Sequence, residues 1–526
     1  MPSSRNNSVE LKSRREMTLP QDVRTYLGTA PRIELSEPLL EELGKLADQE
    51  GVGLFVVGGF VRDLFRGQAR KDIDFTVIGD AIAFARRLAR RFRSKAVVYE
   101  RFHTALVPIG EYRCEFVGTR RESYEPNSRK PIVEEGTLWD DLRRRDFTIN
   151  ALAIALNAPY WGALVDLFGG LWDLQRRHIR TPLDPAVTFN EDPLRMLRAA
   201  RFVALLEGTL AEDARQAMAR LASRIQIVSQ ERVTEELLKL LSTPRPSIGF
   251  LLLCETGLLP YVFPELQNLA GVELVHVGKQ AYGHKDVLRH TLQVVDNVAA
   301  RSDNVWLRLA ALLHDIGKAK TKRFVEGLGW TFHGHEEVGA RMAERIFRRM
   351  KLPLQHLPYV QTLIRLHQRP QALVDEGVTD SAIRRLIVQA GEALEDLFLL
   401  CRADITTRNP VLAQRYLRNY DALQKRIEDV QERDRLRAFQ SPVRGDEIMQ
   451  LCNLPPSPAV GYIKKALEEA ILDGIVPNDY EAVKAYLLEH KEELLAAARA
   501  YEADHFQRRR TARSAPSAER TAPPPS

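Results

Sequence analysis

Two aspartates separated by one residue are the first candidates for chemistry in this chain. Asp72 and Asp74 lie in the run from Lys71 to Ile78, where they alternate with Ile73 and Phe75. Side chains at i and i+2 of a strand point to one face, so a strand here places two carboxylates side by side, opposite the apolar residues. Paired carboxylates repel each other unless a cation lies between them, and Mg²⁺ prefers carboxylates together with phosphate oxygens. The pair therefore predicts a magnesium site.

A glycine pair before the aspartates supplies the second half of this pattern. The run from Leu54 to Val57 reads as a strand, Gly58-Gly59 as a turn, and Arg62 lies one turn into the following helix. Backbone N–H groups that no Cβ shields, and a guanidinium, bind phosphate oxygens. A phosphate-binding turn beside a metal-binding carboxylate pair is typical of nucleotidyl transfer, whereas either feature alone is often only a tight turn or a solvated strand edge.

Together these runs resemble the signature of the polymerase-beta-like nucleotidyltransferases and, more narrowly, of the bacterial-type (class II) tRNA nucleotidyltransferase and poly(A) polymerase family. The resemblance implies an α+β fold, in which a nucleotidyltransferase head with a small mixed sheet precedes an all-α neck, body and tail. It implies that Asp72 and Asp74 are catalytic Mg²⁺ ligands and that Gly58, Gly59 and Arg62 hold the triphosphate.

Further head residues fit the same resemblance. Glu115 alternates with Cys114 and Phe116 and offers a third carboxylate near the metals, or equally a partner for a nearby arginine. Arg145 and Asp146 follow in a run that resembles the second family motif, and there they would read the ribose and phosphates of the nucleotide. A basic cluster of this kind is otherwise usually surface charge.

A helical run then carries Asp192, Arg195, Arg198 and Arg201, whose spacing of three puts them along one helix face. A salt-bridged surface stripe is the ordinary reading of such spacing. The resemblance implies instead that Asp192 and Arg195 pair with the base edge of CTP or ATP, while Arg198 and Arg201 support the base or phosphates. A carboxylate accepts a hydrogen bond from the exocyclic amino group that cytosine and adenine share, and a guanidinium donates to ring acceptors.

A second candidate metal centre lies downstream. His290, the pair His314-Asp315 and Asp404 occur in an order that resembles the HD phosphohydrolase superfamily. His335 and His367 stand where two-metal members of that superfamily add ligands. Imidazole and carboxylate ligands suit Mn²⁺, Ni²⁺, Fe²⁺ or Zn²⁺ better than Mg²⁺ alone, and such a metal would activate water to hydrolyse a phosphoester.

The length of 526 residues predicts several domains. We expect disordered ends at 1–30 and 506–526, a head over 31–185, a neck over 186–270, an HD domain over 271–410 and a tRNA-binding tail over 411–505. The net charge of +6 is modest, so RNA binding requires a local basic surface. Four widely spaced cysteines favour a reducing cytoplasm, and the lack of a long apolar run or signal peptide favours a soluble protein that does not bind a membrane. We expect no obligate protein partner.

The sequence thus predicts an enzyme that adds or repairs the 3′-terminal CCA of tRNA from CTP and ATP, with HD-domain phosphodiesterase or phosphatase activity beside it. A poly(A) polymerase, or an enzyme that adds only CC or only A, shares most of these motifs. Two further alternatives are an HD phosphodiesterase with an inactive RNA-binding head, and an RNA chaperone in which both metal sites are vestigial.

Overall fold

The computed structural model describes residues 19–513, apart from 69, 124–131, 272–273, 278–279, 284–285, 327–328, 375–378, 408 and 435–440. The chain divides into two compact units, Met1–Leu309 with Ile346–Pro353 and Ala310–Arg345 with Leu354–Ser526. The segment 271–410, predicted as one HD domain, has residues in both units. Each unit is described by itself.

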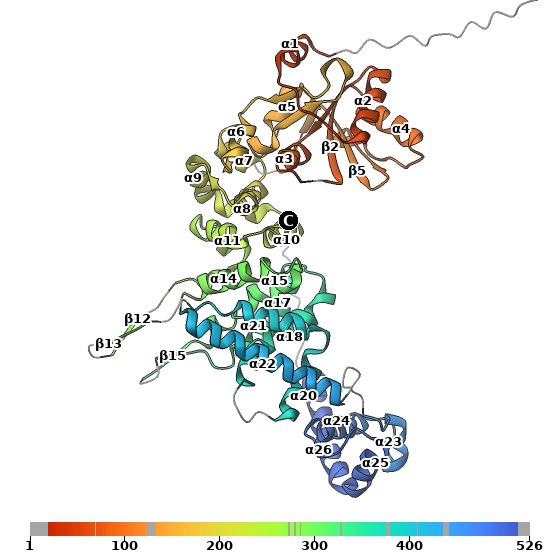
Figure 1. The fold of residues 1–526 in the computed structure, drawn as a ribbon, viewed down its shortest axis with the longest axis vertical. Helices are drawn as coiled ribbons and strands as arrows, with labels where there is room; N and C mark the ends of the chain where they lie inside the picture. Colours follow the sequence, from red (N-terminus) through yellow and green to blue (C-terminus); the bar gives the residue numbers. More distant parts are fainter. Residues whose placement is uncertain are drawn as a thin grey trace, which may run out of the picture. The chain divides into compact units, whose positions relative to one another are not determined.

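A seven-stranded mixed sheet organises the first part of the first unit, with the strand order β3-β4-β5-β2-β1-β8-β9 (Figure 1). The strands are β1 (Gly53–Val57), β2 (Asp72–Ile78), β3 (Val97–Tyr99), β4 (Thr104–Ile109), β5 (Tyr112–Gly118), β8 (Leu152–Ala155) and β9 (Leu164–Asp166). Every neighbouring pair is antiparallel except β2 and β5, which are parallel. This confirms the predicted α+β head with a mixed sheet.

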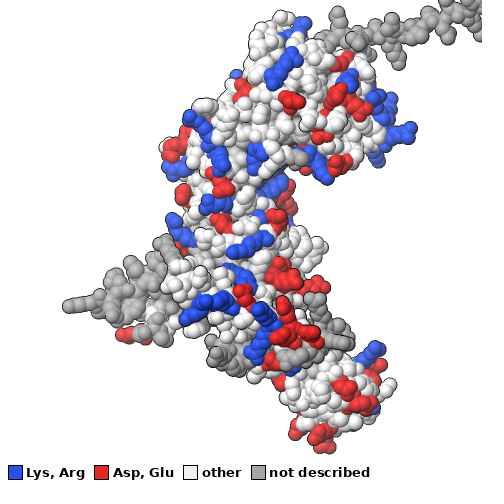
Figure 2. Space-filling model, in the orientation of Figure 1, with Lys and Arg blue, Asp and Glu red and all other residues white. Residues whose placement is uncertain are grey.

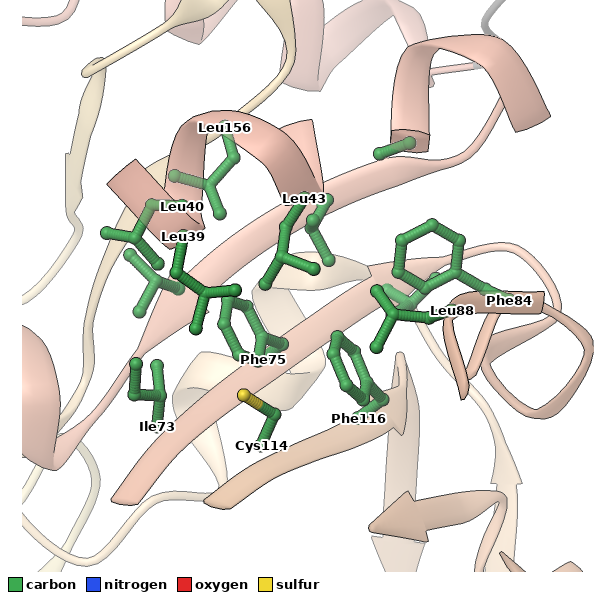
Figure 3. Close-up of a cluster of buried hydrophobic side chains, with 14 of the residues drawn as sticks. Leu39, Leu40, Leu43, Ile73, Phe75, Phe84, Leu88, Cys114, Phe116 and Leu156 are labelled. Atoms are coloured by element: carbon green, nitrogen blue, oxygen red, sulfur yellow. The ribbon is translucent and has the colours of Figure 1, made fainter. Parts of the chain in front are cut away.

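The alternation along β2 separates the core from the open face. Ile73 and Phe75 are fully buried, whereas Asp72 and Asp74 are exposed. On β5, Phe116 stacks on Phe75 with ring centroids 4.8 Å apart. Figure 3 shows these apolar side chains packed with the leucines of α2 (Pro38–Glu50) and with residues of α4 (Ala81–Arg91). Burial of one side of the strand therefore directs both aspartates to the other side.

The remaining elements of the first unit are mostly helical. Its helices are α1 (Gln21–Thr29), α3 (Gly59–Phe65), α5 (Leu138–Arg143), α6 (Gly170–Gln175), α7 (Pro185–Glu191), α8 (Leu194–Leu206), α9 (Glu212–Leu221), α10 (Gln230–Leu241), α11 (Pro246–Glu255), α12 (Leu259–Val262), α13 (Pro264–Gln267) and α14 (Val287–Ala299). Short antiparallel pairs join β6 (Arg120–Ser123) to β7 (Ile132–Glu135) and β12 (Leu274–Val277) to β13 (Gln280–Gly283), and β10 (His178–Ile179) pairs in parallel with β11 (Thr209–Leu210).

Among its described residues, the second unit is helical apart from the antiparallel pair β14 (Arg323–Val325) and β15 (Gly329–Thr331). Helices α15 (Val305–Leu313) and α17 (His335–Arg349) have residues in both units. The others are α16 (Lys318–Thr321), α18 (Leu357–Leu366), α19 (Arg369–Ala372), α20 (Asp380–Ala390), α21 (Leu394–Ala403), α22 (Pro410–Asp434), α23 (Gly445–Cys452), α24 (Pro458–Leu472), α25 (Tyr480–Glu489) and α26 (Lys491–Arg513). Within the described ranges, no helix is both long and apolar enough to cross a membrane.

Two sequence-based expectations about disorder are wrong in part. The segment predicted as disordered, 1–30, contains α1, whose Val23 and Leu27 are buried against the head. Helix α26 continues to Arg513, into the tail predicted as disordered, because its alanines, glutamates and arginines favour helix. Residues 1–18 and 514–526 lie outside the described residues.

The tail helices α23 to α26 enclose a small core of their own. Between Ser441 and Glu502 the chain carries eleven acidic and six basic residues, and Figure 2 shows acidic side chains over this part. Because lysine and arginine supply most of the affinity for nucleic-acid phosphates, the net charge of this segment does not favour phosphate binding. The tRNA-binding tail remains a prediction.

Candidate active site and candidate metal centre

Three carboxylates from two parallel strands form the centre of the head site. The register of β2 and β5 pairs Asp74 with Glu115 and Asp72 with Arg113, so Glu115 lies on the same face as both aspartates. Desolvation by the surrounding protein raises the pKa of Asp74 although its side chain is accessible, and the Asp72 charge adds to this. Burial and the nearby Asp74 charge raise the pKa of Glu115. A cluster that resists ionisation in this way is chemically suited to a divalent cation.

Arg145 lies over the glycine turn beside these carboxylates. Gly58 has φ +70°, and a Cβ built on it would lie 2.7 Å from Nη1 of Arg145 and 3.8 Å from Oδ2 of Asp74. The guanidinium and carboxylate are therefore both within reach of the glycine turn, and the Arg145 charge counteracts the rise in the pKa of Asp74. The glycine is required both by its backbone conformation and by this close approach.

Asp141 is a buried carboxylate beside the site that sequence reasoning missed. It is fully buried and accepts hydrogen bonds from Oγ1 of Thr76 on β2 (2.9 Å), from Nη2 of Arg144 (2.6 Å) and from Nη2 of Arg145 (3.2 Å). Burial opposes its ionisation, but the two arginines more than compensate and lower the pKa of Asp141 to about 2. Asp141 thus holds Arg145 against the strand that carries Asp74.

We expect Asp141→Asn to lower the free energy of unfolding by about 2 kcal/mol at pH 7, the value of a pKa lowered from 3.8 to about 2. A depressed carboxyl pKa stabilises the fold above the unfolded-state pKa, and this contribution disappears as the pH falls through about 4 toward 2. Urea denaturation of wild type and variant at several pH values measures it, with the exposed Glu111→Gln as control. A stability difference that stays constant down to pH 2 would refute this role.

Arg62 has a different environment from the one its motif predicts. Its side chain is only 2% exposed, and its guanidinium donates two hydrogen bonds to Asp63 (2.9 and 2.7 Å) and one to Asn150 (2.6 Å). The guanidinium carbon also lies 4.9 Å from the ring centroid of Phe202. The guanidinium is buried beneath the turn and bound by protein acceptors, and direct contact between Arg62 and the triphosphate remains a prediction.

Arg70 was also missed, and it occupies the position predicted for Arg62. Its Nη1 lies 2.7 Å from the position that a Cβ on Gly59 would take, while its Nε pairs with Asp63 at 2.6 Å. Its side chain is 42% exposed. Only the backbone fold brings Arg70 back over the glycine turn, so no spacing rule indicates it.

The residues predicted to read the base have partners in this structure. Asp192 precedes helix α8 instead of lying on its face, and its carboxylate accepts from the Arg232 guanidinium (3.0 Å) and from the Leu194 N–H (3.2 Å). Arg195 is 9% exposed and donates to the carbonyls of Arg144 (2.8 Å) and Thr188 (3.2 Å) and to Glu191 (3.1 Å). Those bonds account for three of the five N–H donors of a guanidinium.

Asp146, Arg198 and Arg201 belong to one buried network. Arg198 donates to Asp146 (2.7 Å), and Arg201 donates to Glu236 on α10 (2.7 Å). Burial opposes ionisation of Asp146, but Arg198 and Asn150 outweigh it and lower the pKa to about 2. The Asp146 carboxylate is 8% exposed and orients Arg198, and its contact with the ribose or phosphates remains a prediction.

A second cluster lies in the second unit, where His314, Asp315, His335, His367 and Asp404 meet. The Nδ1 atoms of the three histidines each lie 2.7–2.9 Å from a backbone carbonyl three residues earlier, that of Ala311, Phe332 or Ile364. These bonds assign the proton to Nδ1 and leave the Nε2 lone pairs available to a metal ion. His290, on α14 of the first unit, remains a prediction.

Asp315 is the centre of this cluster. Its Oδ2 lies 3.3 Å from Nε2 of His314, while its Oδ1 lies 3.3 Å from Nε2 of His335 and 3.8 Å from that of His367. His314 also approaches Asp404 at 3.6 Å. Burial lowers the pKa of His314, but the two carboxylates reverse this and raise it above its ordinary value. The carboxylates thus favour a positive charge in this cluster, and nitrogen and oxygen ligands of this kind suit a transition metal.

Comparison with known proteins identifies the relatives of this chain. Its residues 54–180 match the poly A polymerase head domain, 209–269 the probable RNA and SrmB-binding site of polymerase A, and 287–408 the HD domain. The chain is 34% identical to an A-adding tRNA nucleotidyltransferase of Deinococcus radiodurans, over 82% of this chain and 94% of that protein. It is 33% identical to a CC-adding tRNA nucleotidyltransferase of Thermus thermophilus, over 82% and 93%.

A solved structure of a CCA-adding enzyme also matches this chain. A crystal structure of the Bacillus stearothermophilus CCA-adding enzyme in complex with CTP matches with a TM-score of 0.64 and 25% identity, over 87% of this chain and 99% of that chain. The names of these relatives differ in the nucleotides that they add.

Proposed function

Since the chain belongs to the tRNA nucleotidyltransferase and poly(A) polymerase family, we propose that it completes or repairs the 3′-terminal CCA of tRNA from CTP and ATP, with release of pyrophosphate. The observation that carries the proposal is the alternation along β2, which puts Asp72 and Asp74 on the open face beside Glu115 and under Arg145. The family and the site support the same chemistry from independent directions.

In this proposal Asp72 and Asp74, with Glu115 beside them, would hold Mg²⁺. When bound, Mg²⁺ lowers the pKa of the attacking 3′-hydroxyl and neutralises charge on the pyrophosphate. Gly58 and Gly59 let phosphates approach the backbone, and Arg145 binds a phosphate or the sugar. Asp141 fixes Arg145, so the guanidinium that contacts the nucleotide is oriented before the nucleotide binds.

Base choice is assigned to Asp192 and Arg195. Arg232 orients the Asp192 carboxylate, which accepts from the exocyclic amino group of cytosine or adenine. Three protein acceptors anchor Arg195, and its remaining N–H donors serve the ring acceptors of the base. Uracil and guanine present a carbonyl in place of the amino group, and the carboxylate repels it.

The experiment uses tRNA transcripts that lack CCA, CA or A, each incubated with CTP alone, ATP alone or both. With a single nucleotide, we expect C to enter only the first two transcripts and A only the last. With both nucleotides, all three transcripts should end in CCA, and extension should stop after the final A. Addition of C alone or of A alone would establish a partial enzyme, a second candidate that the A-adding and CC-adding relatives favour. Long A tails would establish a poly(A) polymerase.

We also propose that the HD cluster binds a divalent transition metal and hydrolyses phosphoesters such as RNA ends. His314, Asp315 and Asp404 would hold one metal, while His335 and His367 would serve a second position that shares Asp315. The free cysteines at 114, 254, 401 and 452 and a tRNA substrate support a reducing, cytoplasmic setting.

We expect His314→Ala to abolish metal binding in the second unit and His335→Ala to lower the metal content by about half, because the two histidines approach different oxygens of Asp315. Metal content per chain, measured by mass spectrometry after loading with Mn²⁺ or Ni²⁺, tests this. The exposed neighbour His333→Ala is the control. Equal metal content in His314→Ala and wild type would exclude this site.

A further inference from the structure

One buried carboxylate in the head forms ion pairs with three guanidinium groups. Asp63 is 3% exposed and pairs with Arg62 (2.7 Å), Arg66 (2.9 Å) and Arg70 (2.6 Å). Burial opposes its ionisation, but hydrogen bonds from Arg62 and Arg66 and the charge of Arg70 outweigh this, so its pKa lies below the ordinary value. One negative charge therefore faces three positive ones at Asp63.

The third arginine is not needed to neutralise Asp63. Arg62 is buried and bound through two nitrogens, and Arg66 is only 18% exposed. Those two cations already more than compensate one carboxylate. An additional half-exposed arginine on such a group contributes little to stability, since solvent screens its charge and ordering the side chain costs entropy. The position of Arg70 calls for another explanation.

Arg70 bridges Asp63 and the turn. Its Nε faces Asp63, whereas its Nη1 lies over Gly59, close to where a Cβ would be. It is also near enough to Asp74 for its charge to favour the ionised carboxylate. The guanidinium thus lies between the backbone that would receive phosphates and the aspartates that would hold the cation, and it is accessible from solvent while Arg62 beneath it is not.

We propose that Arg70 binds the β- or γ-phosphate of the incoming CTP or ATP and stabilises the pyrophosphate leaving group, an assignment that rests on the proposed nucleotidyl transfer. In that reaction the 3′-oxygen bonds to the α-phosphorus and gives up its proton to solvent water. The bond from the α-phosphorus to the bridging oxygen breaks, and its electron pair goes to pyrophosphate. Arg70 meets that growing charge with N–H donors already oriented by Asp63.

The test compares Arg70→Gln and Arg70→Lys with wild type in the full-length chain. The measured quantities are the KM for CTP and the inhibition constants of pyrophosphate and of CMP. For Arg70→Gln we expect the KM and the pyrophosphate constant to rise about tenfold or more, the loss of a charge-assisted hydrogen bond, while the CMP constant stays unchanged. Arg70→Lys should recover part of the loss, because lysine keeps the positive charge but lacks the paired N–H donors of the guanidinium.

Arg86→Gln is the matched control. It also removes one positive charge from the head, and breaks an exposed ion pair with Glu100, without approaching the glycine turn. Unchanged KM and pyrophosphate inhibition in Arg70→Gln would overturn the proposal, as would an equal loss of CMP and pyrophosphate binding, which would indicate general distortion of the site. Failure of nucleotidyl transfer itself is recognised separately, since the wild-type chain would then add no nucleotide.

Discussion

Asp74→Asn should reduce nucleotide incorporation about a thousandfold, a loss of about 4 kcal/mol of transition-state stabilisation. The variant removes one of the two carboxylates that β2 presents on its open face, and with it a ligand of the expected cation. Incorporation of labelled CMP from CTP into a tRNA transcript that lacks CCA, at saturating Mg²⁺, measures the effect.

The same variant should not destabilise the protein. Burial and Asp72 raise the pKa of Asp74, so above that pKa its charge costs folding free energy when no metal is bound. Replacing the charge with a neutral amide removes that cost, and the melting temperature at pH 7 in EDTA should stay the same or rise. Glu111→Gln, an exposed change on the β4–β5 turn, should alter neither quantity. Activity above a tenth of wild type in Asp74→Asn would contradict the assignment.

Gly58→Ala should lower activity about a hundredfold and the free energy of unfolding by about 1–2 kcal/mol. A Cβ there meets Nη1 of Arg145 at 2.7 Å, and the backbone has φ +70°, which costs an alanine about 1 kcal/mol or more. Displacing Arg145 removes it from the nucleotide and from Asp141, so the loss of activity exceeds the loss of stability. Initial rates and urea denaturation provide the two measurements.

Gly67→Ala separates the two causes. Gly67 also has a positive φ, +66°, but a Cβ there meets nothing within 4 Å. This control should show the loss of stability and keep its activity. Similar activity in the two alanine variants would mean that the contact between Gly58 and Arg145 has no catalytic importance.

The parts that the sequence predicted are those set by local rules. A strand of alternating residues directs Asp72 and Asp74 to one face, whatever the rest of the chain does, and the order of strand, glycine turn and helix follows from residues a few positions apart. The histidine cluster was predicted on different grounds, from an order of residues that resembles the HD superfamily, and the structure brings His314, Asp315 and His367 together.

The parts that were missed depend on contacts between distant residues. Asp141 contacts Thr76 65 positions away, and no periodicity indicates that a charged residue is buried there. The segment 120–140 has no clear hydrophobic periodicity, but its described residues include β6, β7 and the start of α5. The capping box of Thr137 and Asp140 begins that helix, and its short polar signal went unrecognised. Spacing in a sequence shows which face a side chain occupies, but not which partner it meets.

The most direct measurement of the central claim is the dependence of CTP binding on Mg²⁺ in wild type and in the double variant Asp72→Asn, Asp74→Asn. Calorimetric titration with CTP, with and without Mg²⁺, provides it. If the paired aspartates hold the cation against the triphosphate, Mg²⁺ tightens CTP binding in wild type and has no effect in the double variant. Equal tightening by Mg²⁺ in both proteins would contradict the account.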